Sequence, residues 1–183
     1  MKQLLAWGAI GLLTASTLLP GTAGATPSEP AHHEKVEVKV NLINTKGDAV
    51  GDAVLTEQED GVHIRLKAKG LSKGAHGIHF HNVGKCEPPA FESAGPHFNP
   101  TAKEHGFKNP KGFHLGDLPN IESAKNGTVE TEIITKNVTL HRNEPNSLLQ
   151  PGGTALVIHE KADDYTTDPA GNSGNRIVCG TIQ

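Results

Sequence analysis

The chain has 183 residues and a formal net charge of −3, from 17 Lys and Arg against 20 Asp and Glu, and only 35% of its residues are hydrophobic. These values fit one soluble globular domain and exclude a multi-span membrane protein, a coiled coil and a disulfide-dense mini-protein. The mild acidity argues against a nucleic-acid binder, which usually carries a basic surplus. The 11 His and two Cys favour metal binding by imidazole and at most one disulfide.

The first 25 residues are typical of a signal peptide. Lys2 is followed by an apolar stretch over residues 4–19 and by the small-residue cleavage site Ala23-Gly24-Ala25. This stretch is too short and interrupted to span a bilayer well, although an uncleaved anchor helix is the alternative. We therefore expect export to the periplasm, the cell envelope or the extracellular space, with no stable membrane insertion after cleavage.

The mature chain is expected to begin with a flexible tail over residues 26–34 and to continue as one domain over residues 35–183. Two adjacent histidines in the tail, His32 and His33, can bind a metal weakly, but such a pair in a terminus usually has no structural role. An oxidising compartment allows Cys86 and Cys179 to pair. With two cysteines in an exported chain, a disulfide explains them better than a catalytic thiol.

Apolar and polar residues alternate with a period of two through much of the domain. In one segment Ile64, Leu66 and Ala68 occupy one face of a strand, while His63 and Arg65 occupy the other. No long stretch has a convincing 3.6-residue helical period. The alternation predicts strands near residues 36–42, 52–57, 62–68, 76–81, 127–134, 154–159 and 176–182. Short strands separated by Gly, Pro and Asn turns indicate an all-β protein, either an antiparallel sandwich or a barrel.

Two segments depart from this pattern, residues 83–125 and residues 160–175. A loop as long as the first is usually functional or disordered, and its His and Phe residues argue against disorder. We expect both loops to carry the chemistry, because loops held on a rigid sheet are the usual place for functional residues.

The histidine spacing predicts metal ligands. His79 and His81 are two residues apart on a predicted strand, so their imidazoles share the face opposite the core. His114 and Asp117 can close on one ion, and three His with one carboxylate form a set typical of structural zinc. An all-imidazole group suits Cu(II). The spacing leaves open how the candidate ligands divide between metals; they are His79, His81, His97, His105, His114, Asp117 and His159.

A hydrolase is an alternative that the motifs do not favour. His159 and Glu160 lack the second histidine of an H-E-x-x-H motif, and they follow a predicted strand rather than lie on a helix. The chain also has no G-x-S-x-G sequence.

Five motifs, in order along nearly the whole mature chain, resemble those of the copper/zinc superoxide dismutase family, and in particular its exported bacterial branch. They are Gly77–His81 (GIHFH), Ser93–Pro100 (SAGPHFNP), His114–Leu118 (HLGDL), His159–Asp164 (HEKADD) and Gly171–Gly180 (GNSGNRIVCG). The resemblance implies an eight-stranded antiparallel Greek-key β-barrel with two long functional loops. It implies an oxidoreductase with one copper and one zinc per subunit, which disproportionates superoxide to O₂ and H₂O₂ and protects against extracytoplasmic superoxide.

The same resemblance implies a role for each candidate residue. Copper is expected on His79, His81, His97 and His159. Zinc is expected on His97, His105, His114 and Asp117, so that His97 bridges the metals and delivers a proton. The remaining roles fall to Asp163, which hydrogen-bonds one ligand of each metal, to His76 behind the copper site, to Arg176, which docks the anion, and to a Cys86–Cys179 disulfide.

The second loop departs from the eukaryotic branch, because it is shorter and has Pro169-Ala170 where that branch has a Lys-Thr pair. Positive steering of the substrate must then come from elsewhere, and the candidates in the first loop are Lys85, Lys103, Lys108 and Lys111. Two other classes stay open: an exported, non-enzymatic copper or zinc binder, and a structural domain that uses only zinc. The quaternary state is open between a monomer and a homodimer, because dimer faces vary between branches of the family.

Overall fold

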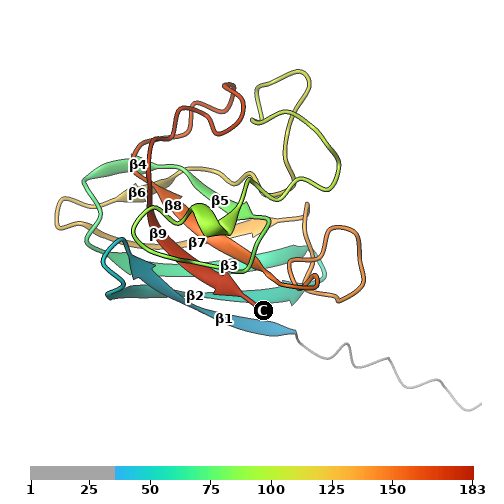
Figure 1. Cartoon of the computed structure of the whole chain (residues 1–183), viewed down its shortest axis with the longest axis horizontal. Coiled ribbons are helices and arrows are strands. Elements are labelled where there is room, and N and C mark those ends of the chain that lie inside the picture. Colours follow the sequence, from blue (N-terminus) through green and yellow to red (C-terminus); the bar gives the residue numbers. More distant parts are fainter. Residues whose placement is uncertain (1–35) are drawn as a thin grey trace, which may run out of the picture. The chain divides into compact units, whose positions relative to one another are not determined.

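The computed structural model describes residues 36–183, in which strands and loops make up almost everything (Figure 1). The predicted signal peptide, the tail with its histidines and the first residue of the expected domain, Lys35, lie outside the described residues. Within the described part, no helix is long and apolar enough to cross a membrane. The elements are β1 (Glu37–Asn44), β2 (Ala49–Gln58), β3 (Gly61–Lys69), β4 (Gly74–His76), β5 (Ile78–His81), the 3₁₀ helix η1 (Glu92–Ala94), β6 (Ile121–Ser123), β7 (Thr128–Thr135), β8 (Thr154–His159) and β9 (Arg176–Ile182).

Seven of these strands form one curled antiparallel sheet in the order β5-β8-β9-β1-β2-β3-β7, and β4 and β6 form a second, two-stranded sheet. Strands distant in sequence are neighbours, since β9 pairs with β1 and β7 pairs with β3. This arrangement confirms the all-β prediction. The seven strands predicted from alternation become nine in the described residues, one more than the eight that the resemblance implies. One is added because the predicted strand 76–81 divides at Gly77, which bonds to Lys161 and His159 instead. The other is β6, which lies inside the predicted first loop.

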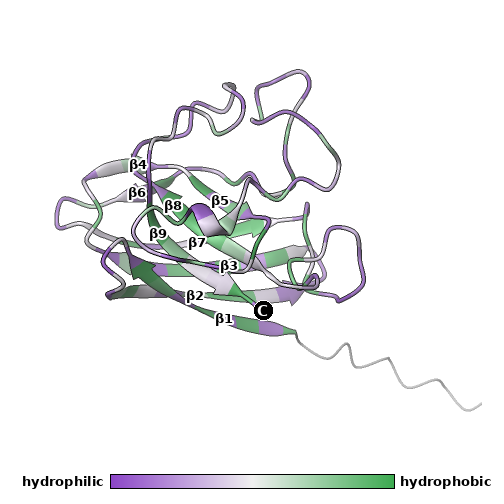
Figure 2. Cartoon of the chain, in the orientation of Figure 1, coloured by the Kyte–Doolittle hydropathy of each residue, from purple (hydrophilic) through white to green (hydrophobic). Residues whose placement is uncertain are grey.

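The core follows from the pleat of the strands. In β3 every second residue is buried, namely Val62, Ile64, Leu66 and Ala68, as the alternation predicts. Figure 2 shows this mixture of hydrophobic and hydrophilic residues along the strands. A fully buried Leu or Ile side chain contributes roughly 1.5–3 kcal/mol, so this interior face supplies a rigid support for the loops.

The strand β8 is buried on both faces. Leu156 and Ile158 pack in the main core, whereas Val157 packs on the outer face with Phe91 of the first loop and with Cys179 of β9. A disulfide joins Cys86 to Cys179, as predicted, and ties this part of the loop to β9. The loop therefore covers the outer surface of the strands that carry His81 and His159.

The two long connections, β5 to β6 and β8 to β9, extend from the same end of the sheet, in yellow-green and orange-red (Figure 1). They contact each other directly: the backbone N–H of Lys108 donates to Tyr165 O at 2.8 Å. Gly106 adopts a φ of +103°, and a side chain there would collide with the carbonyl of Tyr165. Close backbone approach at this glycine lets the loops enclose a site above β5 and β8.

Candidate metal centre

Three histidines project from neighbouring strands beneath the loops. His79 and His81 lie on β5, and their side chains face away from Ile78 and Phe80, which pack in the core. His159 ends β8, the strand that pairs with β5. Strand alternation places the imidazoles on one face, and the loops bury them, since none of the three is more than 2% exposed.

These histidines and His97 of the first loop form one group, with ligand atoms all within 4.8 Å of one another. Each has one buried ring nitrogen without a hydrogen-bond partner in the described structure: Nδ1 of His79 and Nε2 of His81, His97 and His159. A buried polar atom without a partner is costly. Four such atoms that converge from four imidazoles fit a bound metal ion and are difficult to explain otherwise.

The second nitrogen of each ring has a partner that fixes its orientation. His81 Nδ1 donates to Gly95 O at 2.9 Å, and His159 Nδ1 donates to Gly174 O at 3.2 Å. His79 Nε2 donates to Asp163 at 2.8 Å. With the proton on these nitrogens, the opposite nitrogen carries the lone pair that a metal requires.

Burial also keeps these imidazoles neutral. It lowers the pKa of His79 to about 4, that of His97 to about 3 and that of His159 to about 4. Burial likewise holds the pKa of His81 well below its ordinary value. A neutral imidazole is the form that binds metal, so the group does not need to lose protons near neutral pH.

A second group lies beside the first and shares His97. Asp117 Oδ1 lies 3.0 Å from His97 Nδ1, 3.0 Å from His105 Nδ1 and 3.3 Å from His114 Nδ1. His79 also lies close to this group, because its ligand atom and those of His97, His105 and Asp117 are all within 4.8 Å of one another. We assign His79 to the first group, because its Nε2 is bonded to Asp163 and its Nδ1 is the unpartnered atom.

The carboxylate of Asp117 is held by the first loop itself. Asp117 Oδ2 accepts the backbone N–H groups of Gly106 at 2.9 Å and His114 at 3.0 Å. Burial opposes ionisation, but the bonds with the three imidazoles hold its pKa far below the ordinary value. Burial also favours neutral His105, yet its bonds to Asp117 and Asp163 raise its pKa to about 9. The second group thus combines three imidazoles with one anionic oxygen, a donor set typical of zinc, and a metal bound there would displace the extra proton of His105.

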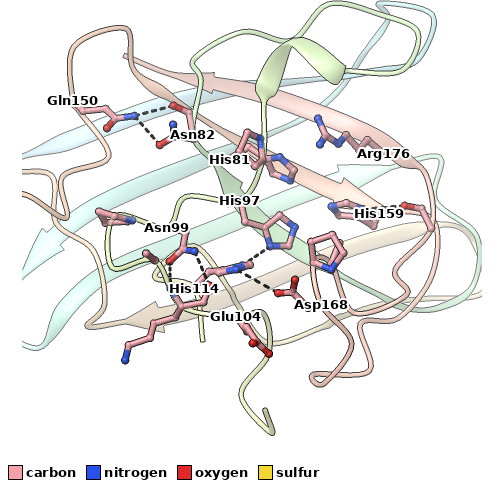
Figure 3. A pocket seen from close by; sticks show the side chains of 17 residues that line it. His81, Asn82, His97, Asn99, Glu104, His114, Gln150, His159, Asp168 and Arg176 are labelled. Atoms are coloured by element: carbon pink, nitrogen blue, oxygen red, sulfur yellow. Dashed lines mark hydrogen bonds and ion pairs between the residues drawn. The ribbon is translucent and has the colours of Figure 1, made fainter. Parts of the chain in front are cut away.

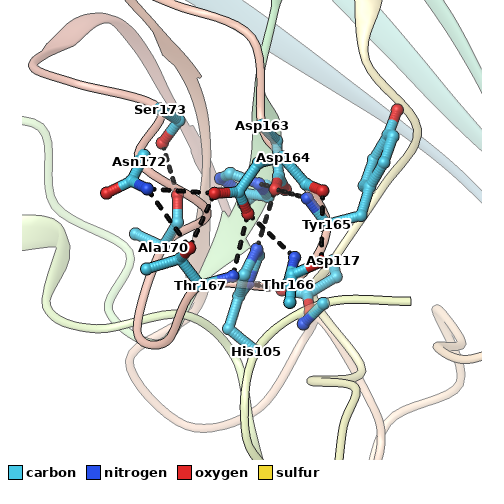
Figure 4. Close-up of polar contacts among 12 residues, drawn as sticks. His105, Asp117, Asp163, Asp164, Tyr165, Thr166, Thr167, Ala170, Asn172 and Ser173 are labelled. Atoms are coloured by element: carbon cyan, nitrogen blue, oxygen red, sulfur yellow. Dashed lines mark hydrogen bonds and ion pairs between the residues drawn. The ribbon is translucent and has the colours of Figure 1, made fainter. Parts of the chain in front are cut away.

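Asp163 contacts a member of each group, and Figure 4 shows it beside His105. Its Oδ2 accepts from His79, and its Oδ1 lies 3.0 Å from His105 Nε2. Burial raises its pKa, but these bonds outweigh burial and lower it. The side chain of Asn120 makes two hydrogen bonds with the backbone of Asp163, both at 2.9 Å: its Nδ2 donates to the carbonyl, and its Oδ1 accepts from the N–H. Sequence reasoning missed Asn120, whose only signal is its place two residues beyond the HLGDL motif.

His76 is buried and contacts the backbone of His159, a member of the first group. Its Nδ1 lies 2.8 Å from His159 O, and its Nε2 lies 2.9 Å from Ser72 O. His76 therefore supports the end of β8 rather than contacting a ring of the first group.

A cavity of about 1060 Å³ opens onto the first group (Figure 3). His81, His97 and His159 line it together with Arg176. The guanidinium donates to Phe91 O and Gly95 O, each at 2.8 Å. Of the four predicted steering lysines, only Lys103 lines the cavity. Lys111 pairs with Glu104 at 3.2 Å, and Lys108 lies over the Tyr165 ring.

The antiparallel β-barrel carries an all-imidazole group and an imidazole–carboxylate group that share His97. A cavity lined in part by Arg176 opens onto the first group. These features define the class of binuclear metalloproteins. Comparison with known proteins gives the particular family. Residues 49–182 match the family model of copper/zinc superoxide dismutase (SODC). The chain belongs to this family and is therefore an oxidoreductase of the superoxide dismutase type, with copper and zinc as cofactors.

Individual relatives agree with this assignment. "Superoxide dismutase [Cu-Zn] 2" of Aquifex aeolicus is 48% identical over 174 residues, which cover 94% of this chain and 97% of the relative. The crystal structure of a SOD-like protein from Bacillus subtilis has a TM-score of 0.77 and 44% identity, and covers 79% of this chain and 97% of its own. Cu/Zn superoxide dismutase from Brucella abortus has a TM-score of 0.67 and 26% identity, over 81% of this chain and 100% of its own.

Proposed function

We propose that this chain binds copper on the all-imidazole group and zinc on the second group, and that it disproportionates superoxide at the first. The copper ligands are His79, His81, His97 and His159. The zinc ligands are His97, His105, His114 and Asp117. The observation that carries this proposal is the convergence of four buried, unpartnered imidazole nitrogens, one from each copper ligand.

Arg176 and His97 have separate roles in the proposed reaction. Bound copper supplies a one-electron couple that accepts an electron from one superoxide and donates it to a second, while zinc does not change its oxidation state. Arg176 attracts the anion to the cavity with a permanent charge and helps to orient it. His97 directs Nε2 to the copper side and Nδ1 to the zinc side. Nε2 would bind copper and, when that bond is released, would hold one of the two protons that H₂O₂ requires.

The decisive experiment separates this enzyme from a metal carrier and from a zinc-only structural domain. The full chain is loaded with copper and zinc, its metal content is measured, and the disappearance of superoxide is followed. We expect one copper and one zinc per chain with rapid catalysis. One zinc without copper and without activity would favour the structural domain, and both metals without activity would favour the carrier.

Substitution of single histidines tests the ligand assignment. His159→Ala removes one of the four copper ligands, so we expect copper content and activity to fall together while zinc stays near one per chain. The matched control is His141→Ala, which removes an exposed histidine outside both groups. Copper that stays bound in the His159→Ala protein at the same affinity would contradict the assignment.

We further propose that the protein is exported and forms a homodimer. The signal-like first 25 residues and the Cys86–Cys179 disulfide support an extracytoplasmic location, since disulfides persist in oxidising compartments. We propose a homodimer as the assembly that light scattering of the purified protein would test. Recovery of the chain in the cytoplasm with both cysteines reduced would contradict export.

A further inference from the structure

A second carboxylate of the loop over residues 160–175 reaches the zinc-side group. Asp168 Oδ1 accepts the backbone N–H of His105 at 2.7 Å. The same oxygen lies 4.0 Å from His114 Nε2, an ion-pair contact drawn in Figure 3. Asp168 thus approaches two of the four proposed zinc ligands, one through its backbone and one through its ring.

The orientation of the His114 ring leaves its Nε2 facing the Asp168 carboxylate. Its Nδ1 faces the group, 3.3 Å from both Asp117 Oδ1 and His97 Nδ1. When Nδ1 bonds to a metal, Nε2 carries the proton and requires an acceptor, and such acceptors set ring orientation at metal sites. Within residues 36–183, Asp168 is the one charged partner found near Nε2, and at 4.0 Å it lies beyond hydrogen-bond distance, so its effect on this ring is electrostatic.

The contact with Asp168 holds the backbone of His105, whose ring is held by two other carboxylates. Its ring nitrogens face Asp117 and Asp163, each at 3.0 Å, and its backbone N–H is taken by Asp168. The following N–H, of Gly106, is bonded to Asp117. Rotation of His105 away from the group would therefore break bonds with both loops.

We propose that Asp168 is a positioning residue for zinc, which fixes the backbone of His105 and orients the ring of His114 in parallel with the action of Asp163 on His105. This inference rests on the zinc assignment proposed above. Carboxylates behind metal ligands typically change metal affinity by about 10–100-fold. The side chain of Asp168 is 48% exposed, so we expect about tenfold, the lower end of that range.

The test measures zinc affinity by competition with a chelator in the full-length protein, together with the NMR signal of the His114 Nε2–H in the zinc-loaded state. Asp168→Ala should weaken zinc binding about tenfold, speed the exchange of this proton with solvent and leave copper affinity unchanged. Asp168→Asn should restore part of the affinity, because its amide oxygen still accepts from His105. The matched control is Asp164→Ala, which removes a carboxylate that accepts the Thr166 and Thr167 N–H groups in the same loop, each at 2.8 Å.

The outcomes distinguish the proposals. Unchanged zinc affinity in Asp168→Ala, with zinc affinity lost in Asp117→Ala, would overturn the positioning role alone. An equal loss in Asp164→Ala would also overturn it, because the effect would then come from the fold of the loop. A wild-type protein that binds no zinc would overturn the zinc assignment and this inference together.

Discussion

Asp163 accepts a hydrogen bond from His79 Nε2 at 2.8 Å, although the two residues are 84 positions apart in the chain. Its other oxygen meets His105, so one buried carboxylate touches one member of each metal group. Asn120 holds the backbone on both sides of this carboxylate. The fold of the 160–175 loop therefore controls ring orientation at both groups at once.

Replacement of Asp163 should weaken the binding of both metals. In Asp163→Ala, His79 and His105 both lose their acceptor, and we expect each metal affinity to fall about 10–100-fold. Chelator competition for copper and for zinc, measured separately, checks this. Asp164→Ala, next in sequence but exposed, is the control. A loss confined to one metal would contradict a shared role.

Arg176 should control the capture of the anion. In Arg176→Gln we expect kcat/KM to fall about tenfold and to depend less on salt, because the cavity loses its fixed charge. Arg176→Lys should retain part of the rate, since it keeps the charge but loses the paired contacts with Phe91 O and Gly95 O. Stopped-flow assays at several salt concentrations measure this, with copper content matched. If kcat/KM of Arg176→Gln depends on salt as strongly as that of the wild type, Arg176 does not attract the anion through its charge.

The disulfide should stabilise the loop that holds Arg176. Cys86 and Cys179 are 93 positions apart, and the chain-entropy estimate for such a loop is roughly 4–5 kcal/mol, an upper figure. In the Cys86→Ser, Cys179→Ser double variant, we expect lower thermal stability and faster hydrogen exchange over residues 83–100. Activity should fall at temperatures at which the barrel is still folded. Unchanged activity and exchange in the thiol-reduced, metal-loaded protein would contradict this.

The strands and part of the candidate metal site could be predicted because both follow local rules. Alternation in β3 identifies the core face, and the two-residue spacing of His79 and His81 places their rings together. The acceptors that orient these rings had no such signal. Gly95 O serves both His81 and Arg176, but a backbone carbonyl in an aperiodic loop carries no sequence pattern.

The absence of a local sequence pattern also explains why β6 and the role of Asn120 were not predicted. Among residues 36–183 the short strand β6 pairs only with β4, and its three residues give too little alternation to detect. The role of Asn120 depends on contact with Asp163, 43 positions away. Such long-range partners are set by the packing of two loops, which spacing along one loop does not reveal.

Lys103 should provide modest steering, since it is the predicted lysine that lines the cavity. At low ionic strength, we expect Lys103→Gln to lower kcat/KM about twofold, with the difference vanishing at high salt. Lys69→Gln makes the same change in net charge on an exposed residue outside the lining and should have no effect. Equal effects of the two substitutions would indicate that net charge alone matters.

His63 should make stability depend on pH, and it lies on a strand that carries none of the proposed metal ligands. On β3, its Nε2 lies 2.7 Å from Asp60 Oδ1 and its Nδ1 lies 3.4 Å from Glu132 Oε1 of β7. The bond to Asp60 raises the pKa of His63 above 6.5, and the same bond lowers the pKa of Asp60 below 3.8. Lys136 adds a smaller effect that also lowers the pKa of Asp60.

The two shifts define a pH window for this cluster. Because the pKa of His63 is raised, its contribution to folding stability is complete below pH 6.5 and disappears as pH rises through the folded-state pKa. Because the pKa of Asp60 is lowered, its contribution to folding stability is present above pH 3.8 and disappears as pH falls through the folded-state pKa. In metal-loaded protein, His63→Gln should therefore lower Tm by at most a few degrees near pH 5.5 and by less near pH 9. The exposed His141→Gln serves as the control. A Tm difference that is constant, or that grows toward pH 9, would show that the charged His63–Asp60 pair does not stabilise the barrel.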